Sequence, residues 1–311
     1  MTTQPFYPFR SEHAKADFEA LCRERAKAWP PGSETMTIET VSGRTFVRAC
    51  GRSTYPPLVL LPGARAGSLM WTHHVAALSA HYRIYALDII GEVGFSVNHH
   101  EISKPDDLVN WLDEVLTALV PAGQLSLMGI SYGGWIAGQY ALRHPGRLRK
   151  IVLLAPGGTV LPLSLAFSIR IGLLLMPLPG RSGTPLRRML TWLFRDTVRT
   201  SDASRALFEE TVADMQKIWH LFALPRPLWS TVLDDQAWQS FGVPCLFLVG
   251  ENEKIYSAQA AVRRLNRVAP QVRTEIVPNA GHDLTIVQAD LVVRKVLEFL
   301  GEPAEAAARA A

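Results

Sequence analysis

The stretch that most constrains this chain is residues 125–135, where an apolar run ends in a serine placed between two glycines. Gly129-Ile130-Ser131-Tyr132-Gly133 has the spacing G-x-S-x-G, and a helical pattern follows it. A strand, a sharp turn and a helix are the setting in which such a serine becomes an exposed nucleophile. Side chains at Gly129 and Gly133 would crowd that turn, so glycine fits both positions. The alternative is an ordinary strand-to-helix turn with an incidental serine, and the motif alone does not exclude it.

The rest of the chain alternates strand and helix patterns around that turn. With the central run, eight strands are predicted, the other seven at residues 35–40, 44–49, 57–61, 82–89, 148–154, 244–249 and 273–277. Strands that alternate with helices favour an α/β fold, a mostly parallel sheet covered by helices on both faces.

A long helical block interrupts this alternation between the sixth and seventh predicted strands. Residues 159–241 are rich in leucine and arginine and contain several prolines. We expect them to form a helical cap inserted in a core made of residues 1–158 and 242–311. The carboxyl ends of the strands are where ligands bind in open α/β sheets, so the cap should lie above that edge.

Composition excludes several other classes of protein. The formal net charge is only +4, and the nearest approach to a basic cluster predicts a solvated helix face, not a nucleic-acid site: Arg187, Arg188, Arg195 and Arg199. The most apolar segment, 161–178, is interrupted by Arg170 and by prolines, so no transmembrane helix is expected. Three cysteines without metal or redox spacing, and no signal-peptide pattern, suggest a reducing compartment and a cytoplasmic location.

A serine nucleophile needs a base and an acid that orients the base, in the chain order serine, acid, histidine. His282 follows the last predicted strand in a glycine-flanked loop, which makes it the candidate base. The loop after the preceding strand carries two carboxylates, Glu251 and Glu253. Glu253 is preferred because it is the third residue after Gly250, the usual position from which the acid reaches the base.

Three other carboxylates remain as alternative acids: Asp88, Glu92 and Asp283. The oxyanion hole needs two backbone N–H groups, and we assign them to Tyr132, which follows the nucleophile, and to Ala64, in the loop after the strand at 57–61. The adjacent pairs His73-His74 and His99-His100 would point apart, so no metal site is expected. No nucleotide-binding motif is present, and no cofactor is expected.

Together these residues resemble the α/β-hydrolase family from about residue 35 to residue 300. The resemblance is carried by Leu60-Leu61-Pro62-Gly63, Trp71, Asp88, Gly129-Ile130-Ser131-Tyr132-Gly133-Gly134, Gly250-Glu251-Asn252-Glu253 and Gly281-His282. Within the family the chain is most similar to bacterial carboxylesterases of the NP type, which hydrolyse esters of aryl-propionic acids such as naproxen. Those esterases also use glutamate as the acid. The chain departs from the common family pattern at Pro62, where many members have histidine, at Glu253, where aspartate is commoner, and at Glu92-Val93-Gly94-Phe95-Ser96.

The resemblance implies a serine hydrolase that cleaves small-molecule carboxylic esters through an acyl-enzyme, with bulky or aromatic apolar substrates. A lactonase, a carbon–carbon bond hydrolase, a perhydrolase or an acyltransferase would use the same serine turn. A ligand receptor that keeps the pocket is an alternative of another class. The sequence leaves a homodimer open.

Overall fold

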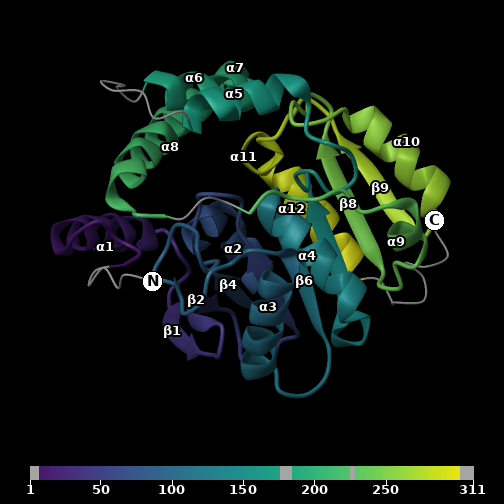
Figure 1. The fold of residues 1–311 in the computed structure, drawn as a ribbon, viewed down its shortest axis with the longest axis horizontal. Coiled ribbons are helices and arrows are strands. Elements are labelled where there is room, and N and C mark those ends of the chain that lie inside the picture. Colours follow the sequence, from purple (N-terminus) through teal and green to yellow (C-terminus); the bar gives the residue numbers. More distant parts are fainter. Residues whose placement is uncertain (1–6, 176–183, 225–227, 302–311) are drawn as a thin grey trace.

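The computed structural model describes residues 7–175, 184–224 and 228–301, and these fold around one sheet (Figure 1). The strands are β1 (Glu34–Glu39), β2 (Gly43–Cys50), β3 (Pro57–Leu61), β4 (Arg83–Leu87), β5 (Val97–Asn98), β6 (Leu125–Ile130), β7 (Leu148–Leu154), β8 (Cys245–Gly250) and β9 (Val272–Val277). Their order is β1-β2-β4-β3-β6-β7-β8-β9, with β5 paired to β2 off this path. β2 is antiparallel to β1, β4 and β5. Along the path from β4 through β3, β6, β7 and β8 to β9, neighbouring strands are parallel, as predicted.

Helices fill most of the connections between these strands. They are α1 (Glu12–Ala26), α2 (Thr72–Ser79), α3 (Pro105–Leu119), α4 (Tyr132–Arg143), α5 (Leu165–Leu175), α6 (Thr184–Leu193), α7 (Arg195–Thr200), α8 (Asp202–Leu221), α9 (Asp235–Gln239), α10 (Ala258–Val268), α11 (Leu284–Val287) and α12 (Ala289–Gly301). Two short 3-10 helices are η1 (Ser68–Trp71) and η2 (Pro145–Arg147). Among the described residues no helix is both long enough and apolar enough to cross a membrane.

The sheet is buried on both faces, which explains the continuous apolar run in β3. Side chains of Val59 and Leu61 join the core cluster that includes α3, α4, α9 and α10. Side chains of Leu58 and Leu60 point the other way, into the cluster with α2 and α12. Successive side chains alternate across a strand, so a strand covered on both sides has to be apolar throughout.

Helices α5 to α8 follow β7 and lie over one end of the sheet, as an upper layer in Figure 1. Residues before α5 contact the loop after β8, because Ser164 Oγ donates to the Lys254 carbonyl at 2.8 Å. The last helix of the interval, α9, packs on α10, and Trp238 lies in the core of the sheet. The predicted cap interval 159–241 therefore contains helices that lie over the sheet edge and a final part that packs against the core.

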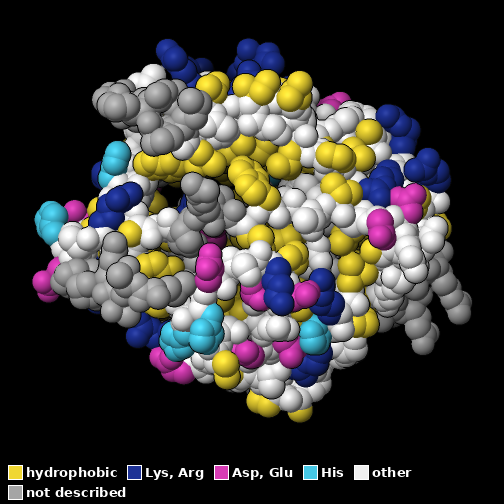
Figure 2. Space-filling model, in the orientation of Figure 1, with side chains coloured by type: hydrophobic (Ala, Val, Ile, Leu, Met, Phe, Trp, Pro, Cys, Tyr) yellow, Lys and Arg dark blue, Asp and Glu magenta, His cyan; other side chains and the backbone are white. Residues whose placement is uncertain are grey.

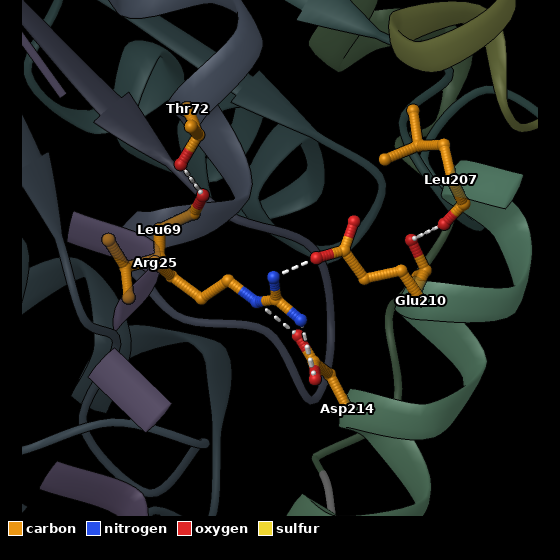
Figure 3. A network of polar contacts seen from close by, with 7 residues as sticks. Arg25, Leu69, Thr72, Leu207, Glu210 and Asp214 are labelled. Carbon is orange, nitrogen blue, oxygen red and sulfur yellow. Dashed lines mark hydrogen bonds and ion pairs between the residues drawn. The ribbon is translucent and has the colours of Figure 1, made fainter. Parts of the chain in front are cut away.

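The N-terminal helix α1 holds the long helix α8 from outside (Figure 3). The Arg25 guanidinium makes two hydrogen bonds to the Asp214 carboxylate, at 2.7 and 3.0 Å, and also bonds to Glu210. Near the end of α8, the backbone N–H of Arg10 donates to the Leu221 carbonyl at 2.9 Å. Thus α8 is attached to the N-terminal segment near its middle and at its end.

The sequence prediction misses one strand and two helix breaks. Of nine strands in the described residues, eight form the main path of the sheet, and β5 adds a two-residue pairing with Gly43 and Arg44 that is too short to show a pattern. The helix expected from Ile286 onward is split into α11 and α12, and the helix expected after Ser68 begins as the 3-10 helix η1.

Candidate active site

Ser131 stands at the sharp turn between β6 and α4, with φ 51° and ψ −113°. A positive φ is rare for a residue with a side chain and indicates strain in the backbone. The turn closes so tightly that a Cβ on Gly129 would lie 2.3 Å from the Gly133 carbonyl oxygen. A Cβ on Gly133 would lie 2.4 Å from the Leu61 carbonyl oxygen. Both glycines are therefore required by the space available.

Backbone from two other loops lies close to this serine. A Cβ built on Gly63 would lie 3.7 Å from Ser131 Cβ, and one built on Gly157 would lie 3.5 Å from Ser131 Oγ. The Gly157 N–H donates to the Ser131 carbonyl at 3.1 Å. Glycine at these positions keeps the space beside the hydroxyl open, and Ser131 itself is partly exposed.

The two amides assigned to the oxyanion hole belong to the loop after β3 and to the first turn of α4. Tyr132 begins α4, and Ala64 is exposed in the turn closed by the bond from the Ala66 N–H to the Gly63 carbonyl at 3.2 Å. Within the described part of the chain, neither the Ala64 nor the Tyr132 N–H donates a hydrogen bond to another protein group. An unpaired donor at a helix start, such as the Tyr132 N–H, suits a developing negative charge.

Glu92, one of the alternative acids, holds that turn in place. It is buried, and its Oε2 accepts a hydrogen bond from the Arg65 N–H at 2.7 Å. Burial raises the pKa of the Glu92 carboxyl, and the nearby Arg65 guanidinium opposes the rise. The Arg65 Nε lies 3.8 Å from the same oxygen.

His282 and Glu253 meet on the loops that follow β9 and β8. The imidazole Nδ1 lies 2.9 Å from Glu253 Oε2, and both side chains are buried. The other oxygen, Oε1, accepts from the backbone N–H groups of Lys254 and Ile255, each at 2.8 Å. A carboxylate with three donors is held in one orientation, so it fixes the imidazole ring as well.

The electrostatics of His282 follow from these neighbours. Burial acts to lower the pKa of the imidazole, but the charge and hydrogen bond of Glu253, and the charge of Asp283, raise it above its ordinary value. No hydrogen bond joins Ser131 Oγ to the imidazole among the described residues. Catalytic hydrogen bonds are often longer when no substrate is bound.

The remaining carboxylates are occupied elsewhere. Glu251 is exposed and accepts from the Asn279 N–H at 3.1 Å. Asp88 is buried and accepts from the N–H groups of Ser68, at 2.6 Å, and Phe95, at 3.0 Å. Asp283 contacts the buried Thr197 of α7, a partner for which the sequence carries no signal.

Apolar side chains of the inserted helices divide into packed and exposed groups. Leu174 and Phe194 pack in the cluster between α6 and α8, and Phe222 is buried with the aromatic residues near α1. Leu173 and Trp219 remain 49% and 38% exposed. Figure 2 shows hydrophobic side chains along this upper layer and a hollow beneath it. Met176, which follows α5 in the chain, lies outside the described residues.

Metal binding and surface hollows away from Ser131 are the remaining questions for the described residues. No group of three or more His, Cys, Asp or Glu side chains there could hold a metal ion. A surface hollow of about 580 Å³, lined in part by Phe9, Phe46 and Phe95, contains none of the five assigned site residues.

Comparisons with known proteins give the chain a context. The model of the "Alpha/beta hydrolase family" matches residues 58–295. The "Uncharacterized carboxylesterase nap" of Bacillus subtilis (strain 168) is 31% identical over 281 residues, 89% of this chain and 89% of that protein. The crystal structure of naproxen esterase (carboxylesterase NP) from Bacillus subtilis covers 94% of this chain and 99% of its own, with a TM-score of 0.82 and 29% identity. A 2-hydroxy-6-oxo-2,4-heptadienoate hydrolase of Pseudomonas putida is 27% identical over 78% of this chain and 88% of that protein.

Proposed function

The chain belongs to the alpha/beta hydrolase family, and from that premise we propose that it hydrolyses carboxylic esters with Ser131, His282 and Glu253. The observation that carries the proposal is the buried hydrogen bond of 2.9 Å between His282 Nδ1 and the Glu253 carboxylate. Ser131, after β6, lies at the end of a strand in the same parallel sheet. A strained serine and an oriented imidazole at one sheet edge support nucleophilic catalysis.

In the proposed reaction, Ser131 Oγ attacks the ester carbonyl carbon while His282 Nε2 takes the hydroxyl proton. The carbonyl oxygen becomes an oxyanion, which the N–H groups of Ala64 and Tyr132 stabilise. Collapse of this intermediate breaks the bond to the alcohol, which leaves with the proton from His282. Water then attacks the acyl-enzyme by the same route, with His282 again taking and returning a proton, and the carboxylic acid is released.

We further propose that the substrate is a small ester with a bulky or aromatic apolar group. Support comes from the two Bacillus relatives, one called a carboxylesterase and the other naproxen esterase. It also comes from the exposed Leu173 and Trp219, because small-molecule sites are lined mainly by apolar side chains. Residues 159–241 would then form the cap of the site.

A series of p-nitrophenyl esters of increasing acyl size, assayed with wild type and Ser131→Ala, tests both the ester hydrolysis and the preference for bulky apolar groups. We expect wild type to hydrolyse them, with kcat/KM higher for branched or aryl acyl groups than for acetate. A strict preference for acetate would contradict the apolar pocket. Absence of any turnover would contradict ester hydrolysis and favour a ligand receptor.

A carbon–carbon bond hydrolase is the second candidate. The Pseudomonas putida relative is named as a hydrolase of 2-hydroxy-6-oxo-2,4-heptadienoate, and the match covers 88% of that protein. The same serine turn could serve it. Incubation with a 2-hydroxy-6-oxo-2,4-dienoic acid separates the two functions, since loss of the diene absorbance without ester turnover would support carbon–carbon cleavage.

A further inference from the structure

Helices α5 to α8, the inserted layer, include one short helix that contacts both loops that carry the proposed base and acid. The helix is α7, and its residues Asp196 and Thr197 make the contacts. Thr197 donates to the Asp283 carboxylate oxygen Oδ2 twice, from its N–H at 2.7 Å and from its hydroxyl at 2.6 Å. Asn252, next to Glu253, donates from Nδ2 to Asp196 Oδ2 at 3.2 Å. Thus α7 is linked to the residue that follows the base and to the residue that precedes the acid.

Asp283 binds backbone groups on both sides of His282, through its carboxylate before the histidine and through its own carbonyl after it. Its second oxygen, Oδ1, accepts from the Gly281 N–H at 3.0 Å, and Gly281 precedes the histidine. The Asp283 backbone carbonyl accepts from the N–H groups of Ile286 and Val287, in α11. Asp283 is 1% exposed and Thr197 is fully buried, so water cannot replace these bonds. A buried carboxylate that loses a donor keeps the cost of its desolvation.

Thr197 also acts on the charge beside the imidazole. Burial raises the pKa of the Asp283 carboxyl, while the hydrogen bonds from Thr197 and Gly281 lower it and Asp196 raises it again. The ionised Asp283 in turn favours the protonated form of His282, as Glu253 does. Loss of the Thr197 hydroxyl would therefore weaken both the position of His282 and its affinity for a proton.

We infer that Thr197 is a positioning residue for His282, through which the placement of the inserted helices sets the geometry of the base. The inference rests on the proposed function, because His282 is the base only there. The link is between residues 86 positions apart in the chain, and it joins the inserted layer directly to the loop of the base. A shift of the inserted helices would thus change the position of His282, the residue that moves the proton.

The test is Thr197→Val, which removes the hydroxyl and keeps the shape, with Thr197→Ser as rescue. Thr200→Val is the matched control: Thr200 lies in the same helix, is exposed, and its hydroxyl donates to the Asp196 carbonyl at 2.7 Å. We expect kcat of Thr197→Val to fall roughly 10- to 100-fold, because a small misplacement of a reacting group has effects of that size. KM should change little. Thr197→Ser should recover most of kcat, and Thr200→Val should match wild type.

A purely structural role for Thr197 would lower thermal stability and leave the titration of His282 unchanged. We expect instead that the acid limb of the kcat/KM profile moves to lower pH in Thr197→Val, and that the NMR titration of the His282 imidazole moves with it. Asp283→Asn should give the same direction of shift in any folded preparation. An unchanged His282 titration in Thr197→Val would overturn the inference while ester turnover stands. An inactive wild type would overturn the proposed function, and the NMR titration would still decide the coupling.

Discussion

Replacing Glu253 with glutamine perturbs the assigned acid without changing its shape. Glu253 Oε1 accepts from two backbone N–H groups at 2.8 Å, so the glutamine oxygen has to stay there. The amide nitrogen then takes the place of Oε2, 2.9 Å from His282 Nδ1. That nitrogen is only a donor, so Nδ1 must accept and the hydrogen of the neutral imidazole moves to Nε2. In this tautomer His282 cannot take the proton of Ser131.

The size of the effect follows from that orientation. A wrong imidazole tautomer reduces kcat about 10⁴-fold in a well-studied protease triad. We expect Glu253→Gln to lose roughly 10²–10⁴ in kcat, toward the upper end because the two backbone donors prevent the amide from turning round. That loss corresponds to about 3–5 kcal/mol of transition-state stabilisation. KM should change little, because the carboxylate is buried behind the imidazole.

The pH dependence of the same variant is a second measurement. The charge and hydrogen bond of Glu253 hold the pKa of His282 above its ordinary value, against the lowering effect of burial. The amide removes the charge, so the pKa of His282 should fall. The acid limb of kcat/KM, recorded by p-nitrophenol release, should then move to lower pH.

Glu251→Gln is the matched control, since Glu251 is two residues away, exposed, and bonded to the Asn279 N–H at 3.1 Å. It should retain nearly full activity. If Glu251→Gln lost more activity than Glu253→Gln, the acid role would pass to Glu251, and the argument from the hydrogen bond to His282 would be refuted.

Two further predictions concern the serine turn. Ser131→Ala should reduce hydrolysis by several orders of magnitude, on the order of 10⁶ in a well-studied triad, and a fluorophosphonate probe should label wild type only; labelling that persists in the variant would exclude Ser131 as nucleophile. Gly133→Ala should lower the free energy of unfolding in urea by about 1–3 kcal/mol, because its Cβ would lie 2.4 Å from the Leu61 carbonyl oxygen. Gly146→Ala, with nothing within 4 Å of the added Cβ, should be unaffected, and equal stability of the two variants would contradict the packing argument.

The architecture could be predicted because its causes are local in the sequence. A strand buried on both faces has to be an apolar run, and Leu58 to Leu61 show why, with alternate side chains in two separate core clusters. The strained turn at Ser131 has to have glycine at 129 and 133, for the space reasons given above. These requirements appear in any chain that folds this way, so the pattern indicates the fold.

The choice between Glu251 and Glu253 could not be made from side-chain alternation. In an extended loop the two residues would point the same way. The structure turns the chain there instead, since the Glu253 N–H donates to the Gly250 carbonyl at 3.1 Å. That turn places Glu253 in the interior and leaves Glu251 at the surface. Which carboxylate faces the imidazole is therefore decided by a backbone bond that the residue types do not reveal.

The contact between Thr197 and Asp283 marks where sequence reasoning ends. Periodicity predicts a helical interval at residues 159–241, and the structure has helices α5 to α9 there with non-helical stretches before α5 and between α8 and α9. The pattern does not show which helix meets the sheet edge. Thr197 lies in an arginine-rich segment for which the sequence predicts a solvated helix face, yet its side chain is fully buried. Long-range pairing of this kind depends on how the inserted helices pack against the sheet edge. Residues that couple a covering layer to a reacting group are for that reason the ones that only the three-dimensional arrangement can identify.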